Sequence, residues 1–366
     1  MNILDFLRNA VQKRASDIHI KVGNPPVLRI DGRIVPTEYK PLTPADTRQA
    51  LYSLMSADQR QRFEQDREID ISMTIEGLSR FRVNVYFEQG NIGAAMRVIP
   101  IKTPTVDTLD LPPVIKKLAL ERQGLILCTG PTGSGKSTTL TAMLEFVNTT
   151  KDVHIITVED PIEFVYTNKK SVITQREIGH DTMTFPNAIK YALRQDPDVI
   201  LIGEMRDQET IMAAVKAADT GHLVLSTLHT TDAVQTLVRV ISTFDPHEQD
   251  GIRQQLASIL RGSISQRLIP RANGQGRVAA IEVLVSTPTV TDLIHKNEVD
   301  GLYGVLAQGG MEGMQSMNQA LFNLYQDDLI TLDDALSYSE TPNELQRMMR
   351  GAYHGSGSSF QAGLTG

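Results

Sequence analysis

Residues 130–137 carry the clearest chemistry in this chain. Their sequence is Gly-Pro-Thr-Gly-Ser-Gly-Lys-Ser, which follows the apolar run 125–128 and precedes a helical pattern. Glycines at this spacing let backbone N–H groups turn toward phosphate oxygens, while Lys136 adds a positive charge and the Ser137 hydroxyl can join a Mg²⁺ shell. The segment therefore predicts a loop that holds a nucleoside triphosphate with Mg²⁺. The residues predicted to bind this ligand are Gly130, Pro131, Thr132, Gly133, Ser134, Gly135, Lys136, Ser137 and Thr138.

Two acidic segments follow strand patterns further along the chain. Glu204 comes shortly after the apolar run 199–202, at the position where a carboxylate handles Mg²⁺ through water. The usual Asp-Glu pair is Gly203-Glu204 here, so one acid serves where two often do. The second segment covers residues 159–163. Because the carboxyl ends of parallel strands lie along the ligand crevice, both segments are expected beside the γ-phosphate.

Two histidines flank the strand pattern 223–227. His229, at its carboxyl end, faces the predicted crevice and is expected to sense the γ-phosphate. His222, at the amino end, is either a second nucleotide contact or a structural group, since a single histidine often serves local hydrogen bonding. The sequence does not favour a zinc site at this pair, because neither a cysteine nor a third histidine lies nearby.

The composition argues against several classes of function. With 36 basic and 43 acidic residues the net charge is −7, whereas proteins that track nucleic acid usually carry a basic stripe. The single cysteine, Cys128, excludes an internal disulfide and a multi-cysteine zinc site, and its apolar neighbours favour a buried packing role. No run approaches the roughly 20 apolar residues that span a bilayer. A cytoplasmic protein without a nucleic-acid partner is expected.

The elements that must position these residues predict an α/β fold with several parts. Residues 1–100 combine short alternating strands with helical patterns, which predicts a small α+β domain. Prolines mark residues 101–115 as a linker. From 116 to 287 apolar runs alternate with helices, as in a core built on a parallel sheet. Residues 288–350 are predicted to be helical, and the Gly- and Ser-rich residues 351–366 to be a disordered tail.

Individual elements can be predicted as well. Residues 44–67 are expected to be helical, starting after the cap Thr43. The strands predicted in the larger domain cover 125–128, 155–158, 199–202, 223–227, 266–269 and 278–284. The helices predicted between them cover 137–148, 186–194, 208–219 and 232–242.

Five ordered motifs together resemble the secretion-ATPase superfamily of RecA-like hexameric motors. They are residues 130–137, 158–163 (Val-Glu-Asp-Pro-Ile-Glu), 203–207 (Gly-Glu-Met-Arg-Asp), 220–223 (Thr-Gly-His-Leu) and 227–231 (Thr-Leu-His-Thr-Thr). Within that superfamily the chain is similar to the type IV pilus retraction ATPases of the PilT and PilU branch. Residues 15–19 (Ala-Ser-Asp-Ile-His) and 80–84 (Arg-Phe-Arg-Val-Asn) match the short N-terminal domain of that branch. The extension relatives carry a four-cysteine metal insert, which a chain with one cysteine cannot hold.

The resemblance implies a fold and an activity. The fold is a PAS-like N-terminal domain followed by a RecA-like ATPase core, assembled as a homohexameric ring. The activity is Mg²⁺-dependent ATP hydrolysis that powers pilin disassembly in twitching motility, with the ring held at the cytoplasmic membrane by the platform protein of the pilus machine. By position, Lys136 and Ser137 hold phosphate and Mg²⁺, Glu163 is the base and Glu204 is the Walker B acid. Arginines from the N-terminal domain are expected to reach the nucleotide, namely Arg80, Arg82 and Arg97.

Two other functions stay open. Residues 289–296 depart from the C-terminal signature of PilT proteins, and residues 313–321 and 329–336 look closer to the PilU branch, whereas the phosphate loop looks more like PilT. The chain could therefore be an accessory nucleotide-binding subunit that acts on a paralogous retraction ATPase. A DNA translocase of the same fold is a third reading, and the acidic charge balance argues against it.

Overall fold

The computed structural model describes residues 2–30, 32–75, 77–99 and 103–357, which divide into two compact units. The first unit contains the described residues up to Thr103 together with Glu163–Tyr166. The second contains Pro104–Ile162 and the described residues from Thr167 onward. Each unit has its own sheet and its own apolar core, and the predicted α/β class is confirmed. Of the predicted linker 101–115, residues 101 and 102 lie outside the described residues.

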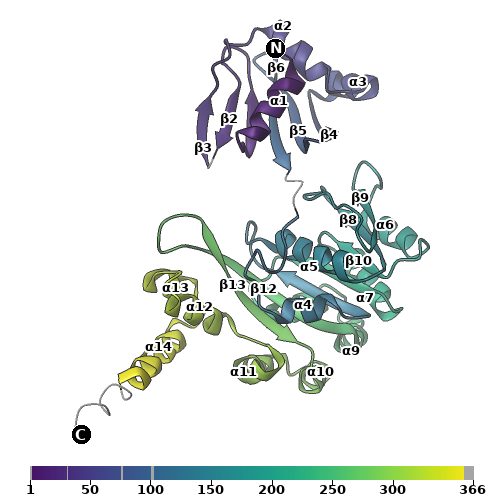
Figure 1. The fold of residues 1–366 in the computed structure, drawn as a ribbon. Coiled ribbons are helices and arrows are strands. Elements are labelled where there is room, and N and C mark those ends of the chain that lie inside the picture. Colours follow the sequence, from purple (N-terminus) through teal and green to yellow (C-terminus); the bar gives the residue numbers. More distant parts are fainter. Residues whose placement is uncertain (1, 31, 76, 100–102, 358–366) are drawn as a thin grey trace. The chain divides into compact units, whose positions relative to one another are not determined.

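The first unit is built on a six-stranded antiparallel sheet with the order β3-β2-β1-β6-β5-β4 (Figure 1). Alternate residues of β5 are buried, among them Phe81, Val83 and Val85, so one face of the sheet packs on the core. The strands are β1 (Asp17–Ile20), β2 (Val27–Ile30), β3 (Arg33–Pro36), β4 (Glu68–Ile75), β5 (Ser79–Glu88) and β6 (Asn91–Ile99).

Three helices complete the core of the first unit, namely α1 (Ile3–Gln12), α2 (Pro44–Tyr52) and α3 (Ala57–Asp66). The stretch predicted to be helical over 44–67 is helical up to residue 66 except for residues 53–56, which separate α2 from α3. Ser56 caps α3 in a reciprocal pair of hydrogen bonds with Gln59, and this capping box favours a new helix start over continuation of α2. A PAS-like classification of this unit stays a prediction.

The second unit is built on a seven-stranded sheet with the order β13-β12-β7-β11-β10-β8-β9. All neighbouring strands are parallel except β13, which pairs antiparallel with β12. The middle strands β7, β10 and β11 are buried along their whole length, as in parallel sheets covered on both faces. The strands are β7 (Gly124–Thr129), β8 (His154–Glu159), β9 (Val172–Glu177), β10 (Val199–Ile202), β11 (Leu223–Leu228), β12 (Leu260–Pro270) and β13 (Arg277–Val285).

The predicted strands and helices of this unit are present, most of them close to their predicted bounds, but the strand predicted over 266–269 begins six residues earlier, at Leu260. Its main apolar core joins residues of β7, β10 and β11 to residues of the helices that follow them, such as Ile211, Leu237 and Leu256. Strand β9 escaped prediction because its sequence is largely polar, with buried surface only at its end. The helices are α4 (Val114–Ala119), α5 (Lys136–Thr150), α6 (Phe185–Ala192), α7 (Gln208–Asp219), α8 (Ala233–Ser242), α9 (Gln249–Ile259) and α10 (Pro288–His295).

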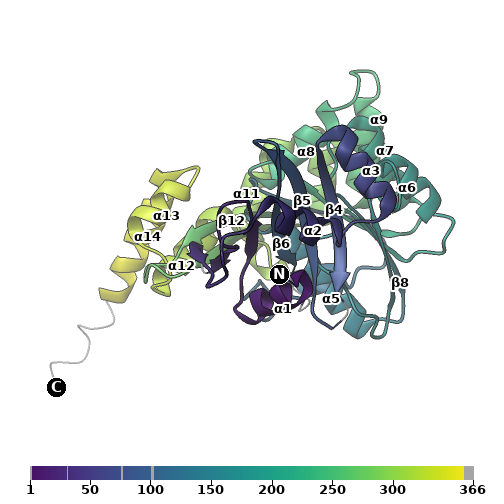
Figure 2. The same cartoon turned by 90° about the horizontal axis from the view of Figure 1, so that it is seen from above.

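The C-terminal region is helical, as predicted, and packs beside the β12–β13 hairpin (Figures 1 and 2). A separate apolar cluster joins Ile269 and Ala280 of the hairpin to Leu321 and Leu345. The disordered tail predicted from residue 351 is wrong for residues 351–357, which continue α14, while residues 358–366 lie outside the described part of the chain. The helices are α11 (Leu302–Gln308), α12 (Met317–Gln326), α13 (Leu332–Tyr338) and α14 (Pro342–Gly357). Within the described residues, no helix is long and apolar enough to cross a bilayer.

Candidate nucleotide-binding site

The glycine-rich loop connects β7, a central strand of the sheet, to the start of α5. Gly130, Gly133 and Gly135 have φ values of 140°, 77° and 92°, a region that residues with a Cβ atom rarely enter. Gly135 caps α5, so no side chain covers the first N–H groups of that helix. These groups carry the positive end of the helix dipole, which is the usual binding place for a phosphate.

Gln266 on β12 explains why two of these positions must be glycine. A Cβ atom on Gly130 would lie 2.3 Å from the backbone oxygen of Gln266, and one on Gly135 would lie 2.7 Å from its Nε2. Oε1 of Gln266 also accepts a 2.6 Å hydrogen bond from Thr139 in the first turn of α5. Gln266 therefore lies close to both ends of the loop and is hydrogen-bonded to the helix that follows it. The sequence analysis gave Gln266 no role, and the signal available was a polar amide inside a predicted strand, where a buried polar group needs a hydrogen-bond partner.

Lys136 is the first residue of α5 and lies against the loop. Its Nζ donates to the carbonyl oxygens of Gly130 at 2.9 Å and Pro131 at 3.1 Å. Ser137, the next residue, is exposed at the same helix start. Cys128 in β7 is fully buried, and burial raises its pKa to about 12, so the thiol stays neutral. The packing role predicted for Cys128 is confirmed.

Glu204 follows β10 at the same edge of the sheet. Strand β10 is two strands away from β7, which places their ends about 10 Å apart at the usual spacing. Oε1 of Glu204 lies 2.6 Å from the guanidinium of Arg206, and Oε2 lies 3.7 Å from Nε2 of His229. Arg206 was given no role from the sequence. Its position two residues after a predicted catalytic acid is the sequence feature that could have indicated a role for Arg206.

The second acidic segment begins beside Glu204. The N–H of Gly203 donates to the carbonyl oxygen of Val158 at 2.8 Å, which joins the two strand ends. Glu159 is buried and accepts hydrogen bonds from Thr157 at 2.7 Å and from Gln175 at 3.2 Å, so this carboxylate has a structural setting. Glu163 is exposed and belongs to the first unit by its contacts, and its role as a base stays a prediction.

The two histidines stand at opposite ends of β11. Strands β11 and β7 run parallel and in register from their first residues to their last, so His229 follows β11 at the end where the phosphate loop begins. His222 precedes β11 at the other end, where its backbone oxygen accepts from the N–H of Gly124 at 3.0 Å. Its Nδ1 lies 2.9 Å from the carbonyl oxygen of Ala217. Within one chain His222 thus makes local hydrogen bonds at that end of the strand, and its role as a nucleotide contact stays a prediction.

The three arginines expected at the nucleotide lie in the first unit. Arg80 and Arg82 are on β5, Arg97 is on β6, and Arg82 pairs directly with Arg97 across the two strands. Nε of Arg97 lies 3.0 Å from a carboxylate oxygen of Asp17, and Arg82 is exposed. Because Arg80 and Arg82 are two residues apart on one strand, they share a face of the sheet. Contact of these arginines with the nucleotide stays a prediction.

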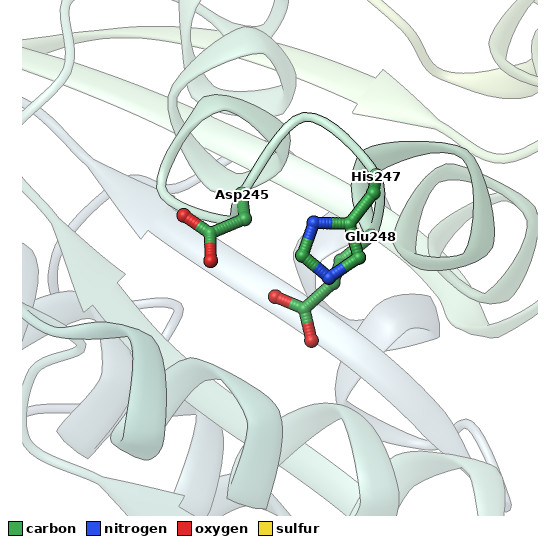
Figure 3. A group of neighbouring side chains, drawn as sticks. All are labelled: Asp245, His247 and Glu248. Carbon is green, nitrogen blue, oxygen red and sulfur yellow. The ribbon is translucent and has the colours of Figure 1, made fainter.

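A cluster outside this site has ligand-type side chains. Figure 3 shows Asp245, His247 and Glu248 close together in the turn before α9. Asp245 and His247 are exposed, and Glu248 accepts a 3.0 Å hydrogen bond from the amide of Gln208. Exposed groups of this kind are common on protein surfaces, and we assign no metal to them.

The arrangement at the sheet edge suits phosphoryl chemistry. An N–H-lined loop, the ammonium of Lys136 and the hydroxyl of Ser137 come from the β7–α5 junction. A carboxylate, Glu204, and an imidazole, His229, come from the ends of the next two strands. Such a set can hold a triphosphate, supply oxygen ligands to Mg²⁺ and respond to the terminal phosphate.

Comparison with known proteins gives one family. The model of the family described as "Type II/IV secretion system protein" matches residues 2–320. The type IV pilus retraction ATPase PilT of Pseudomonas aeruginosa is 43% identical over 342 residues, which are 93% of this chain and 99% of that protein. The type IV pilus ATPase PilU of the same organism is 40% identical over 350 residues, which are 96% of this chain and 92% of that protein.

Solved structures agree with this result. A crystal structure described as the pilus retraction motor PilT with bound ADP matches with a TM-score of 0.89 and 45% identity, over 95% of this chain and 99% of that one. The ATPase DotB of Legionella pneumophila matches with a TM-score of 0.76 and 28% identity, over 92% of this chain and 95% of that one.

Proposed function

The chain belongs to the type II/IV secretion system protein family, in its PilT and PilU branch, and we propose that it is the ATP-hydrolysing motor of type IV pilus retraction. It is a P-loop ATPase that acts in twitching motility. The observation that carries this function is the set formed at one sheet edge by the phosphate loop, Glu204 and His229. A relative that covers nearly the whole chain retracts pili by its name, which supports the same role here.

We assign the steps of catalysis to residues of this chain. The loop N–H groups and Lys136 bind the phosphates and oppose the charge that develops during transfer. Ser137 and Glu204 offer a hydroxyl and a carboxylate, the oxygen ligands that Mg²⁺ prefers, and bound Mg²⁺ neutralises phosphate charge. His229, beside Glu204, reports the presence of the terminal phosphate. Glu163 is the proposed base that aligns the attacking water.

The assembly and place of action belong to the same proposal. We infer a homohexameric ring on the cytoplasmic face of the inner membrane, held there by the platform protein of the pilus machine. Arg80, Arg82 and Arg97 are the proposed source of additional positive charge at the nucleotide.

The test measures ATP turnover and mass of the purified protein with ATP and Mg²⁺. The proposal expects a particle of about six subunits whose turnover is lost in Lys136→Ala and Glu204→Gln variants. A monomer without turnover would overturn the motor function, and full turnover in either variant would overturn the site assignment.

A second candidate function has one observation in its favour, the 40% identity to PilU over 96% of the chain. In that case the protein is an accessory subunit that acts on a partner retraction ATPase. Retraction in cells distinguishes the two. A Lys136→Ala variant that restores twitching only where a partner ATPase is present indicates the accessory role, and one that fails in every background indicates an autonomous motor.

A further inference from the structure

Glu282 on β13 is a buried carboxylate that joins the starts of two helices. Its side chain is close to inaccessible, with the residue 4% exposed. One carboxylate oxygen accepts from the N–H of Ala233 at 2.9 Å, and the other accepts from the N–H of Met317 at 3.3 Å. Ala233 is the first residue of α8 and Met317 is the first residue of α12. The contact therefore links the ATPase core to the C-terminal helical region.

The α8 side of this contact leads directly to the proposed phosphate sensor. His229 lies four residues before Ala233 in the sequence. The intervening turn is fastened to the helix, since the hydroxyls of Thr230 and Thr236 are 2.7 Å apart and Asp232 accepts from the N–H of Gln235 at 2.7 Å. A displacement of His229 is thus expected to move the first turn of α8 as a unit.

The α12 side leads to the C-terminal helices. Asn318, the second residue of α12, donates to the hydroxyl of Thr341 at 2.7 Å and accepts from Ser339 at 2.6 Å. Those two residues lie between α13 and α14. Leu321 of α12 and Leu345 of α14 belong to one apolar cluster. The start of α12 is therefore tied to the rest of the C-terminal region by hydrogen bonds and by packing.

The sheet sets Glu282 level with the phosphate loop. One residue from each of the neighbouring strands β11, β7, β12 and β13 lies at the same level of the sheet. In that order these paired residues are Leu228, Thr129, Ser265 and Glu282. Thr129 precedes the loop directly, and its hydroxyl donates to that of Ser265 at 3.0 Å. Because residues directly opposite on paired strands point to one face, Ser265 and Glu282 share a face at this level.

A carboxylate buried in this way is costly unless hydrogen bonds fill its lone pairs. Two helix N-termini supply both hydrogen bonds and positive partial charge. At a position on β13 that served packing alone, an apolar side chain would be buried at a lower cost in free energy. The carboxylate therefore indicates a role in which both helices are attached at one place.

We propose that Glu282 is a positioning residue that couples the His229 turn to the C-terminal helices through the N-termini of α8 and α12. When the terminal phosphate changes at His229, the start of α8 moves and Glu282 transmits that movement to α12. The inference rests on the proposed ATPase function, because the nucleotide is the signal that it transmits.

The experiment measures hydrogen exchange in the full-length protein with and without Mg²⁺ and the slowly hydrolysed analogue ATPγS. The segments read are 230–237, at the start of α8, and 313–321, at the start of α12. A Glu282→Gln variant keeps one acceptor oxygen and turns an NH₂ group toward the other N–H. The matched control is Glu340→Gln, which removes a neighbouring carboxylate that pairs with Arg267 and leaves both helix contacts intact.

The proposal expects the analogue to change exchange in both segments of the unsubstituted and Glu340→Gln proteins. In Glu282→Gln the response of segment 313–321 is lost, while affinity for the analogue changes less than about twofold. Exchange at the start of α12 without nucleotide rises about tenfold or more in that variant, as expected for loss of a hydrogen bond to a charged group.

A second variant tests the contact from the other side. Met317→Pro removes the N–H that donates a hydrogen bond to Glu282 and leaves the carboxylate in place. The substitution is at the first position of a helix, where proline is well tolerated. It is expected to lose the same response of α12.

Three results would overturn the coupling. Either variant could keep the nucleotide response of segment 313–321, even with faster exchange overall, which would mark a structural role alone. The unsubstituted protein could bind the analogue without a response at α12. It could also fail to bind, in which case the proposed function fails as well.

A protein that binds the analogue and shows the response at α12 but does not hydrolyse ATP would contradict the motor function and support the coupling.

Discussion

Nε2 of His229 lies 3.7 Å from Oε2 of Glu204, so the proposed phosphate sensor touches the proposed metal-handling acid. The two residues follow neighbouring parallel strands, β11 and β10, and the strand that leads to the phosphate loop is next in the sheet. Glu204 is also fixed by Arg206 at 2.6 Å. A change at the terminal phosphate would therefore reach His229 and the acid together.

Glu204→Gln is expected to lower kcat about a hundredfold or more and to leave ATP affinity within a few-fold. The amide keeps the size of the side chain and removes the charge that would hold Mg²⁺ and that pairs with Arg206. Steady-state turnover and equilibrium binding of a fluorescent nucleotide measure the two quantities. A variant that loses affinity and keeps its kcat would assign Glu204 to binding instead.

His229→Ala and His222→Asn form a matched pair at the two ends of β11. His229→Ala is expected to reduce kcat at least tenfold, because it removes the group at the crevice end. His222→Asn keeps a polar atom near the carbonyl oxygen of Ala217 and is expected to leave turnover close to normal. Both are measured by phosphate release at saturating ATP. Equal losses would place His222 in the active site after all.

Gly135→Ala is expected to weaken ATP binding about tenfold or more. The new Cβ would lie 2.7 Å from Nε2 of Gln266, whose Oε1 is hydrogen-bonded to Thr139, and φ at this position is +92°. Gly274→Ala is the control, since its φ is +71° and nothing lies within 4 Å of the added Cβ. Both variants carry the cost of a left-handed residue, about 1–2 kcal/mol. If calorimetry gave similar ATP affinities for the two variants, the close approach of the new Cβ to Gln266 would not be the cause of weaker binding.

Much of the site was predictable because its parts are local in sequence. The loop at 130–137 is one continuous motif, and the ends of parallel strands must meet at one edge, which brought Glu204 and His229 to the loop. The fold followed for the same reason, since buried strands read as apolar runs. The polar edge strand β9 lacked that signal.

Contacts between distant parts of the chain were out of reach of the sequence. Gln266 meets Thr139 across 127 positions, and Glu282 meets Ala233 across 49. Which buried polar residue faces which helix start depends on sheet register and on the packing of the helices, and no local pattern encodes either. The break between α2 and α3 is different, because it is marked locally by the capping pair Ser56 and Gln59, which lie three residues apart in the sequence.

Cys128 is expected to resist alkylation in the folded protein. It is fully buried in β7, and burial raises its pKa to about 12, so at pH 8 the reactive thiolate is almost absent. Iodoacetamide at pH 8 followed by mass measurement should leave the native protein unlabelled, whereas the same protein in concentrated guanidinium takes one label. Rapid labelling of the native protein would mean that β7 opens readily, in conflict with its place between two other strands in the interior of the sheet.

The last prediction concerns the pH dependence of stability that Glu282 introduces. The pKa of Glu282 is raised from an ordinary value of 4.5 to about 7. Burial is the main cause, the neighbouring carboxylates of Asp232 and Glu340 add to the rise, and the two helix N–H groups oppose it. Tyr303, which bonds Asp232, and Arg267, which pairs with Glu340, are the other ionisable groups in this cluster. The folded protein therefore holds a proton on Glu282 more tightly than the unfolded chain does.

The sign follows from proton binding. Between pH 4.5 and about 7 the folded state carries more protons at Glu282 than the unfolded state, so the free energy of unfolding falls as the pH rises through that window. At 1.36 kcal/mol per pH unit the fall attributable to this residue is about 3 kcal/mol. Glu282→Gln cannot titrate and should lack it. Urea unfolding followed by circular dichroism is measured at pH 5 and pH 8 on both proteins. Comparing the two proteins separates the contribution of Glu282 from that of the other carboxyl groups. Parallel changes in the two proteins would contradict the prediction. A steeper fall in the unsubstituted protein would show that the charged carboxylate, the form that accepts from both helix starts, is held in place at the expense of stability.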